Sequence, residues 1–570
     1  MVRQHPGAMF LNRSRTVLSN SDGKPARWEW WLGAAVLVFL VYWRWRATSR
    51  FRIESDEPQH LHVVWGWMRG MLPYRDFFDN HTPLFHWLYA PVLRALGERA
   101  DIVVAMRIAV LPVWAMTLGC VYGLGRALWN ARAGWWAAVL TAAQGTFFYT
   151  SLEFRPDGLW ALLWVAAIWA AVSGMRGEST GSRMKFFGAG LLAGMALATS
   201  IKTVLLVGSF GAAAVLAWLL LLGEKQSRVA VQWRVIGMNV ALLAAGAAVV
   251  PLGWVLYFRQ KGALAEAAYC LFHHNTSSLS EALAFQPRML ILPAALLSAM
   301  GLAWVFLRKE ARSFERSWIL FGAVIYASGL VGFWSGLTPL TDQDWLPWMP
   351  LAMVLLAGGL GTWPALAVLA FLLVGVVRDP VDNTPAPGKY ERFLANVLKL
   401  TGPDDYVMDA KGEAIYRRRP YFFVLETQTR RKLIAGDLPD DIPERLVATR
   451  TAVTRTNRLP DRAEAFVEAH YLRVGRGTSV LGQDLFSSEL EPTRYEFEVG
   501  VPERYVIVGK NGPVTGELDG TPLKNARELT AGRHIFIRSS PAQPIALFWA
   551  RAAEKGFSAF AARDLERGER

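Results

Sequence analysis

The stretch Ile53-Glu-Ser-Asp-Glu-Pro-Gln-His-Leu-His62 contains three carboxylates and two imidazoles in a chain that is otherwise rich in apolar residues. A carboxylate between apolar helices loses hydration, so its pKa rises unless cations or donors surround it, and a partly desolvated carboxylate is a good general base. Asp56 and Glu57 directly precede Pro58, so they would serve equally well as the cap of a helix that starts there. Spacing alone leaves both interpretations open.

The segment Ser151-Leu-Glu-Phe-Arg-Pro-Asp-Gly158 contains a second acidic group. Glu153, Arg155 and Asp157 share a loop so short that all three must lie at the membrane face. An arginine there can hold Asp157 ionised by charge pairing. Asp157 as a helix cap, with Arg155 as an interfacial anchor, is the alternative.

Lys202 separates two short apolar windows. A cation at that depth is costly unless it meets an anion such as a phosphate or a carboxylate. A lysine whose ammonium reaches the interface explains the position equally well. Residues 342–344, Asp-Gln-Asp, fall on the same side of the membrane and are interpreted as a solvated loop.

Six of the nine histidines fall in two proposed outer loops, which suggests a shared polar site. They are His60, His62, His81 and His86 in the first loop and His273 and His274 in the second. Taken singly, each is better explained as an interfacial side chain that hydrogen-bonds water or a lipid headgroup. His60 and His62 in particular are interpreted in that way.

The composition predicts a polytopic membrane protein. Of the 570 residues, 53% are hydrophobic and only 19% are charged, below the roughly 25% usual in soluble domains. About eleven windows are apolar and long enough to be membrane spans. They lie near 29–47, 102–125, 133–150, 158–174, 186–200, 203–222, 235–257, 289–307, 317–334, 346–361 and 363–377. The net charge of +14 is expected in cytoplasmic loops and near headgroups and does not indicate a nucleic-acid partner.

The distribution of basic residues predicts the topology. With the N-terminal segment 1–28 in the cytoplasm, the inner short loops hold twelve Lys and Arg and the outer ones five. Lys and Arg resist translocation, so this orientation is favoured. An odd number of spans then places residues 379–570 outside the cytoplasm, and the membrane domain covers 29–378. Two cysteines, Cys120 and Cys270, are too few for a disulfide framework.

The segment 379–570 is predicted to be a soluble α+β domain that ends in a β-rich module. Short β-type runs occur in DYVMDA, PYFFVLE, RYEFEVG, RYVIVG and HIFIRSS, and 441–473 has helical character. In the first outer loop, Leu61, Val64, Trp65 and Met68 share one helical face, which predicts a short helix at the membrane surface. A second apolar helix, 84–96, is too short to span.

The run Asp56 to Pro91, DEPQHLHVVWGWMRGMLPYRDFFDNHTPLFHWLYAP, resembles the first outer loop of bacterial family-39-type membrane glycosyltransferases of the GT-C fold. That family resembles protein O-mannosyltransferases and lipid A aminoarabinose transferases. The resemblance extends to the acid after the third span, the multi-span core and the outer C-terminal domain. It implies an inverting hexosyl- or pentosyltransferase of the inner membrane. The donor would be a polyprenyl-phosphate sugar and the acceptor an extracytoplasmic glycan, lipid or protein.

The resemblance also implies roles for individual residues. Asp56 matches the acid that deprotonates the acceptor, with Glu57 as its neighbour and helper, and Asp157 with Arg155 matches the second acid. Arg75, Asp76 and Asp79 match the part of the motif that shapes the loop, and Arg75 and Asp79 are also candidate substrate-binding residues. The chain departs from the family where His-Lys-Pro-Pro would stand, because it has Asn80-His81-Thr82-Pro83. His81 replaces the lysine that would meet the donor phosphate.

Several assignments stay open at this stage. Lys202, His273 or Arg155 would be the source of the missing positive charge, and the adjacent His274 is a further candidate for substrate binding. Some relatives hold a divalent metal ion with histidine and carboxylate, so a divalent ion is an open cofactor. A transporter or flippase for lipid-linked sugars, or a catalytically inactive anchored binding protein, would be the alternatives. Transport favours polar groups near the middle of the bilayer, whereas these charges gather at one face.

Overall fold

The structure is a computed structural model that describes residues 23–176, 180–222, 233–276, 294, 313–334, 340–378, 388–488 and 491–560. Contacts within the chain divide it into two units. The first unit comprises Met1–Phe51, Asn80–Leu88 and Met106–Thr384, and the second comprises Arg52–Asp79, Tyr89–Ala105 and Pro385–Arg570. The second unit therefore combines most of the first loop with the C-terminal segment, which the sequence analysis assigned to separate domains.

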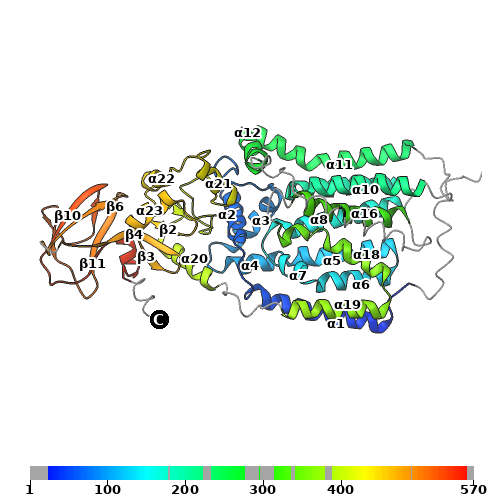
Figure 1. Ribbon diagram of the computed structural model, residues 1–570, viewed down its shortest axis with the longest axis horizontal. Helices are drawn as coiled ribbons and strands as arrows, with labels where there is room; N and C mark the ends of the chain where they lie inside the picture. The colour runs from blue at the N-terminus through cyan, green and yellow to red at the C-terminus, as the bar shows by residue number, and fades with distance from the viewer. Residues whose placement is uncertain are drawn as a thin grey trace, which may run out of the picture. The chain divides into compact units, whose positions relative to one another are not determined.

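The first unit is a bundle of helices that pack side by side, with α9 against both α8 and α11 and α10 against α16 (Figure 1). Its main helices are α1 (Arg27–Thr48), α5 (Leu111–Leu128), α6 (Ala131–Ala143), α7 (Gly145–Thr150), α8 (Pro156–Met175), α9 (Thr180–Thr199), α10 (Thr203–Leu222), α11 (Trp233–Gln260), α16 (Phe314–Gly329), α18 (Met349–Gly359) and α19 (Thr362–Arg378). Shorter elements are α4 (Ile102–Ala109), which continues from the second unit, α12 (Leu264–Ala268), α13 (His274–Thr276), the π-helices η2 (Tyr269–His273) and η4 (Leu330–Trp334) and the 3-10 helix η5 (Asp342–Trp345).

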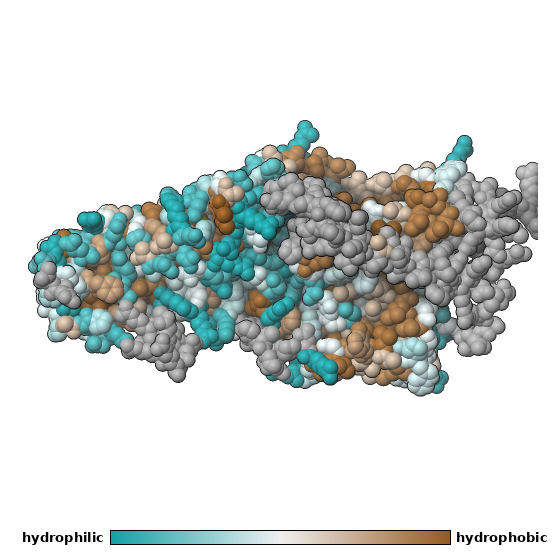
Figure 2. Space-filling model, in the orientation of Figure 1, coloured by the Kyte–Doolittle hydropathy of each residue, from teal (hydrophilic) through white to brown (hydrophobic). Residues whose placement is uncertain are grey.

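In the described part of the chain, five segments are long and apolar enough to cross a membrane. They are Ile102–Leu128, Pro156–Met175, Thr203–Leu220, Trp233–Gln260 and Phe314–Gly332. Large apolar side chains such as Trp31, Trp363 and Phe371 are exposed on the first unit, and hydrophobic residues gather on its surface in Figure 2. Such a surface suits lipid. Helices occupy every predicted window in the described part of the chain, and the window 289–307 lies outside it.

The second unit begins with the first-loop helices α2 (Asp56–Met68) and the later part of α3 (Leu84–Leu96), so both predicted loop helices are confirmed. Its C-terminal segment contains a seven-stranded sheet, in the order β1-β2-β4-β11-β6-β9 with β3 beside β4, and a four-stranded sheet, β5-β10-β7-β8. The strands of the first sheet are β1 (Val407–Met408), β2 (Val453–Thr454), β3 (Tyr471–Gly475), β4 (Thr478–Leu485), β6 (Glu503–Gly509), β9 (Arg527–Leu529) and β11 (Ile545–Trp549). Those of the second are β5 (Arg494–Val499), β7 (Gly516–Leu518), β8 (Thr521–Pro522) and β10 (Gly532–Arg538).

Helices α20 (Gly388–Leu400), α21 (Thr427–Ala435), α22 (Ile442–Ala448), α23 (Asp461–His470) and α24 (Ala550–Glu554) complete this α+β segment. Four of the five predicted β-type runs contain strands, and the fifth, PYFFVLE, does not. Its aromatic rings instead pack within the second unit. The ring centroids of Phe422 and Phe423 lie 5.8 and 5.3 Å from that of Phe78 in the first loop. Packing against the loop accounts for the apolar residues that suggested a strand.

The apolar face of α2, which was predicted to lie at the membrane surface, packs inside the protein instead. Leu61, Val64 and Trp65 are buried inside the protein, and so are His60 and His62 on the rest of the helix. The Nδ1 atom of His62 is 2.8 Å from the carbonyl oxygen of Ile415, in the C-terminal segment. His60 and His62 are therefore core side chains, because the C-terminal segment covers the helix.

Burial lowers the pKa of His62 to about 4, so the imidazole is neutral in the folded protein. An unfolded chain binds a proton at this residue below about pH 6.5, and the folded chain does so only near pH 4. The contribution of His62 to stability is therefore full above pH 6.5 and is lost as the pH falls toward 4. Burial next to Glu413 raises the pKa of Asp409 and gives a trend of the opposite sign.

We therefore predict that His62→Asn, which keeps a donor for Ile415, weakens the acid destabilisation of the full chain. Between pH 7.5 and pH 5, the free energy of unfolding is expected to fall by about 2 kcal/mol more in wild type than in the variant. Thermal unfolding of wild type and variant in the same detergent at both pH values measures it, and comparing the two proteins cancels the contribution of Asp409. The exposed His273→Asn is the control, and an identical pH dependence in wild type and His62→Asn would contradict the burial argument.

Candidate active site

Asp56, the predicted base, is the first residue of α2 and forms an ion pair with Lys411 of the C-terminal segment. The Nζ atom of Lys411 is 2.5 Å from Oδ1 of Asp56 and 3.4 Å from Oγ of Ser55. The exposed fractions of the two side chains are 11% for Lys411 and 26% for Asp56. The pair is thus largely shielded from water, while the carboxylate keeps partial access.

The neighbouring acids organise the start of the helix. Oε2 of Glu57 accepts a hydrogen bond from the backbone N–H of Glu54 at 3.0 Å, and Oε2 of Glu54 accepts one from the N–H of Asp56 at 2.6 Å. Glu57 is fully buried. Glu54 thus satisfies the free N–H of the first helical residue, whereas Glu57 binds the N–H of a residue that precedes the helix. The N-cap residue in this geometry is Ser55, without a side-chain cap hydrogen bond.

Asp157 and Arg155, in the first unit, also form an ion pair. Nε of Arg155 is 3.2 Å from Oδ2 of Asp157, with exposed fractions of 11% and 7%. Both come from the start of α8, where Pro156 fixes the first turn. The expected charge pairing is therefore present. Arg155 also lines a small pocket together with Glu153, which accepts a hydrogen bond from Nε2 of Gln343 at 2.8 Å.

Lys202 is paired with Asp344, whose Oδ1 lies 2.5 Å from the ammonium. Asp344 and Gln343 are buried, so the interpretation of 342–344 as a solvated loop is wrong for these two residues; only Asp342 is exposed. Asp344 also accepts from the N–H of Thr341 at 2.9 Å. The lysine therefore meets a carboxylate, one of the two anions that the sequence analysis considered.

The two histidine-bearing loops of the first unit meet through asparagines. Nδ2 of Asn80, beside His81, is 3.2 Å from Oδ1 of Asn275, which follows His274. The rings of His81 and His86 lie 6.2 Å apart, and both His273 and His274 contact the ring of Tyr269. His274 is buried and His273 is exposed. The structure thus brings together the segments that carry these histidines.

Arg75 and Asp76 of the first-loop motif contact each other and the backbone just before them. Arg75 pairs with Asp76 at 2.8 Å, and Oδ2 of Asp76 accepts from the N–H of Leu72 at 2.7 Å. Asp79 is buried. The bond between Asp76 and Leu72 spans the turn after α2. The proposed binding roles of Arg75 and Asp79 stay predictions.

The donor set does not fit a metal ion. Among the described residues, no three His, Cys, Asp or Glu side chains come together as a group that would hold one. One oxygen of Asp56 is engaged by Lys411, and one oxygen of Asp157 by Arg155. We derive no step of the reaction through a metal.

Sequence reasoning missed the segment 409–419, Asp-Ala-Lys-Gly-Glu-Ala-Ile-Tyr-Arg-Arg-Arg, which contains Lys411. Its Asp409, Lys411, Glu413 and Arg417 are buried, and Nε of Arg419 is 3.1 Å from Oδ1 of Asp409. The density of charge after the predicted strand DYVMDA was a usable signal. The motif residues that carry the resemblance lie in the first loop, and none of them corresponds to this segment.

Comparisons with known proteins agree with this architecture. Residues 80–254 match the model of the family described as dolichyl-phosphate-mannose-protein mannosyltransferase. No curated protein matches the sequence. ArnT from Cupriavidus metallidurans in the apo state has a similar structure, with a TM-score of 0.54 and 15% identity over 79% of this chain and 97% of that one.

The structure of the same ArnT bound to undecaprenyl phosphate gives a TM-score of 0.52, with the same identity and coverage. The archaeal oligosaccharyltransferase AglB from Archaeoglobus fulgidus, in complex with an inhibitory peptide and a dolichol-phosphate, gives a TM-score of 0.45 and 11% identity over 81% of this chain and 74% of that one. The chain thus has the GT-C fold of membrane glycosyltransferases such as ArnT, and its residues 80–254 match the protein mannosyltransferase family.

Proposed function

We propose that the protein is an inverting glycosyltransferase that moves a sugar from a polyprenyl-phosphate donor to an acceptor outside the cytoplasm. The observation that carries this proposal is the fold shared with ArnT over 97% of that chain's length. One of the ArnT structures holds undecaprenyl phosphate, which indicates the class of donor. The family model matched by residues 80–254 is named for a related donor, dolichyl-phosphate mannose.

The residues of this chain suit such a transfer. The Asp56 carboxylate would take the proton of an acceptor hydroxyl or amine, and the acceptor atom would attack the anomeric carbon from the face opposite the phosphate. The bond between that carbon and the phosphate oxygen breaks, and polyprenyl phosphate leaves with both electrons. Asp157, held by Arg155, would orient the acceptor.

A lipid-linked-sugar transporter remains the second candidate from another class, and an inactive binding protein the third. Charges buried inside a transporter usually mark a pathway near the middle of the membrane. Here Asp56 and Asp157 each lie at the start of a helix, and each is paired with a cation. That arrangement favours chemistry at the ends of helices over passage through them.

Transfer from a radiolabelled polyprenyl-phosphate sugar to a membrane extract tests the proposal. We predict that Asp56→Asn lowers the rate by at least about 10²-fold, because the amide cannot accept the proton. Asp157→Asn should lower it by a smaller factor, because that acid orients the acceptor. Asp404→Asn, at an exposed ion pair, is the control. Wild-type rates in both acid variants would refute the catalytic assignment.

The orientation is a separate prediction. A reporter that is active only outside the cytoplasm, fused after residue 378, should be active, because the distribution of Lys and Arg places this end outside. The same reporter fused at residue 226 should be silent. The reverse pattern would overturn both the orientation and the location of the proposed site.

A further inference from the structure

The segment 409–414 of the C-terminal part is folded into a tight turn that presents Lys411. The carboxylate of Asp409 accepts hydrogen bonds from the N–H groups of Gly412 at 2.5 Å and Ala414 at 2.7 Å. Oε2 of Glu413 accepts the N–H of Lys411 at 2.8 Å. The backbone around Lys411 is thus held by two buried carboxylates.

Gly412 lets this turn approach α2. Its φ is +86°, in the left-handed region that favours glycine, and a Cβ at this position would lie 2.7 Å from Cβ of His62. His62 in turn contacts the carbonyl of Ile415. The backbone of the turn therefore packs directly against a side chain of α2, about 1.7 helical turns from Asp56 along the helix.

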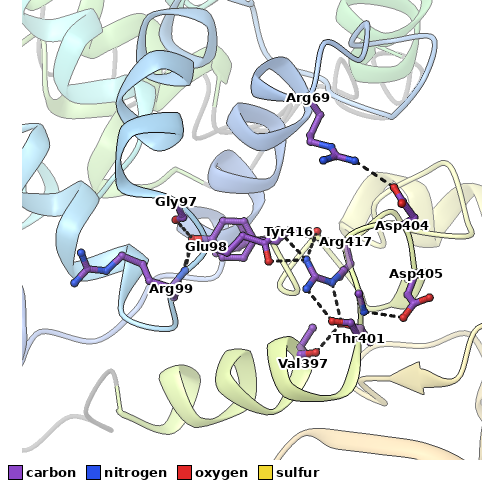
Figure 3. Close-up of polar contacts among 12 residues, drawn as sticks. Arg69, Gly97, Glu98, Arg99, Val397, Thr401, Asp404, Asp405, Tyr416 and Arg417 are labelled. Atoms are coloured by element: carbon purple, nitrogen blue, oxygen red, sulfur yellow. Dashed lines mark hydrogen bonds and ion pairs between the residues drawn. The ribbon is translucent and has the colours of Figure 1, made fainter. Parts of the chain in front are cut away.

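A second group of contacts fixes the same segment to the first loop (Figure 3). The Nη1 atom of Arg417 is 3.0 Å from both carboxylate oxygens of Glu98. The other two guanidinium nitrogens of Arg417 donate hydrogen bonds to Thr401. The hydroxyl of Tyr416 lies 3.3 Å from the carbonyl oxygens of Gly97 and Arg99. Arg417 is 2% exposed and the Glu98 side chain 37%, so the arginine end of this attachment is shielded from water.

We propose that Lys411 is a positioning residue of the transfer reaction, which holds the Asp56 carboxylate ionised and oriented, and that the C-terminal segment is therefore part of the active site. The inference rests on the proposed function. It gives the Asp56 carboxylate a cationic partner that lies 355 residues away along the chain.

The role follows from electrostatics. An opposite charge within about 4–6 Å favours the ionised form of a carboxylate, by about 1–3 pH units. Glu54 and Glu57 lie beside Asp56 on its own segment and would oppose its ionisation. On the C-terminal segment, Asp409 is paired with Arg419, and Arg455 offsets Glu413. Lys411 thus supplies a positive charge in direct contact with Asp56.

The test compares Lys411→Met, which keeps the length of the side chain without its charge, with Lys411→Arg. In kcat/KM against pH, Lys411→Met should move the acid limb upward by about 1 unit or more, so that the rate on that limb falls about tenfold and recovers at high pH. Lys411→Arg should keep the limb near its wild-type position. Asp404→Asn removes an exposed contact between the same two segments, the ion pair of Arg69 with Asp404 at 3.2 Å. This variant should leave the acid limb at its wild-type position.

A second measurement does not depend on activity. In a chain with Cys120→Ser and Cys270→Ala, Asp56→Cys places a thiol beside Lys411. Its pKa, from the rate of iodoacetamide alkylation against pH, should lie below the usual value of about 8.5 and rise by about 1 unit when Lys411→Met is added. Asp404→Asn should leave it unchanged.

The outcomes separate the two proposals. An acid limb that stays in place in Lys411→Met, or a rate lowered equally at every pH, overturns the role of Lys411, while loss of transfer in Asp56→Asn still supports the function. Absence of transfer by wild type overturns the function. In that case the pKa of the Asp56→Cys thiol still tests whether Lys411 controls ionisation at position 56. A thiol pKa that is unchanged when Lys411→Met is added refutes this role of Lys411.

Discussion

Charged groups that are removed from water must be paired, because an isolated buried ion costs several kcal/mol. This constraint holds within each of the two units. Asp56 is paired with Lys411, Asp157 with Arg155, and Lys202 with Asp344. Removing one partner of such a pair is costly, since the other is left buried and uncompensated. Each ionised group that the chemistry needs is thus tied to a particular neighbour.

The pairing of Asp56 explains why the first loop and the C-terminal segment form one unit. The turn at 409–414 brings Lys411 to the carboxylate, and Gly412 allows the close approach to His62. Arg417 and Tyr416 hold the same segment against residues 97–99. The C-terminal segment therefore acts on the proposed base through defined contacts, and its sheets support the turn.

Local sequence patterns predicted the elements well. The helical periodicity after Pro58 placed α2, alternation in RYEFEVG and RYVIVG placed β5 and β6, and the short loop before α8 placed Arg155 next to Asp157. Long-range contacts were not predictable in this way. The partner of Asp56 is 355 residues away, and the burial of His62 depends on a segment that no local pattern connects with it. The same limit explains why residues 343 and 344 were taken for a solvated loop.

The central claim is that Lys411 and Asp56 interact directly, and a double-mutant cycle on the stability of the full chain tests it most directly. Wild type, Asp56→Asn, Lys411→Met and the double variant would be unfolded thermally in one detergent. We predict that the double variant loses less stability than the sum of the single variants, with a coupling of about 0.5–3 kcal/mol. Additive losses would contradict the ion pair and, with it, the place of the C-terminal segment in the active site.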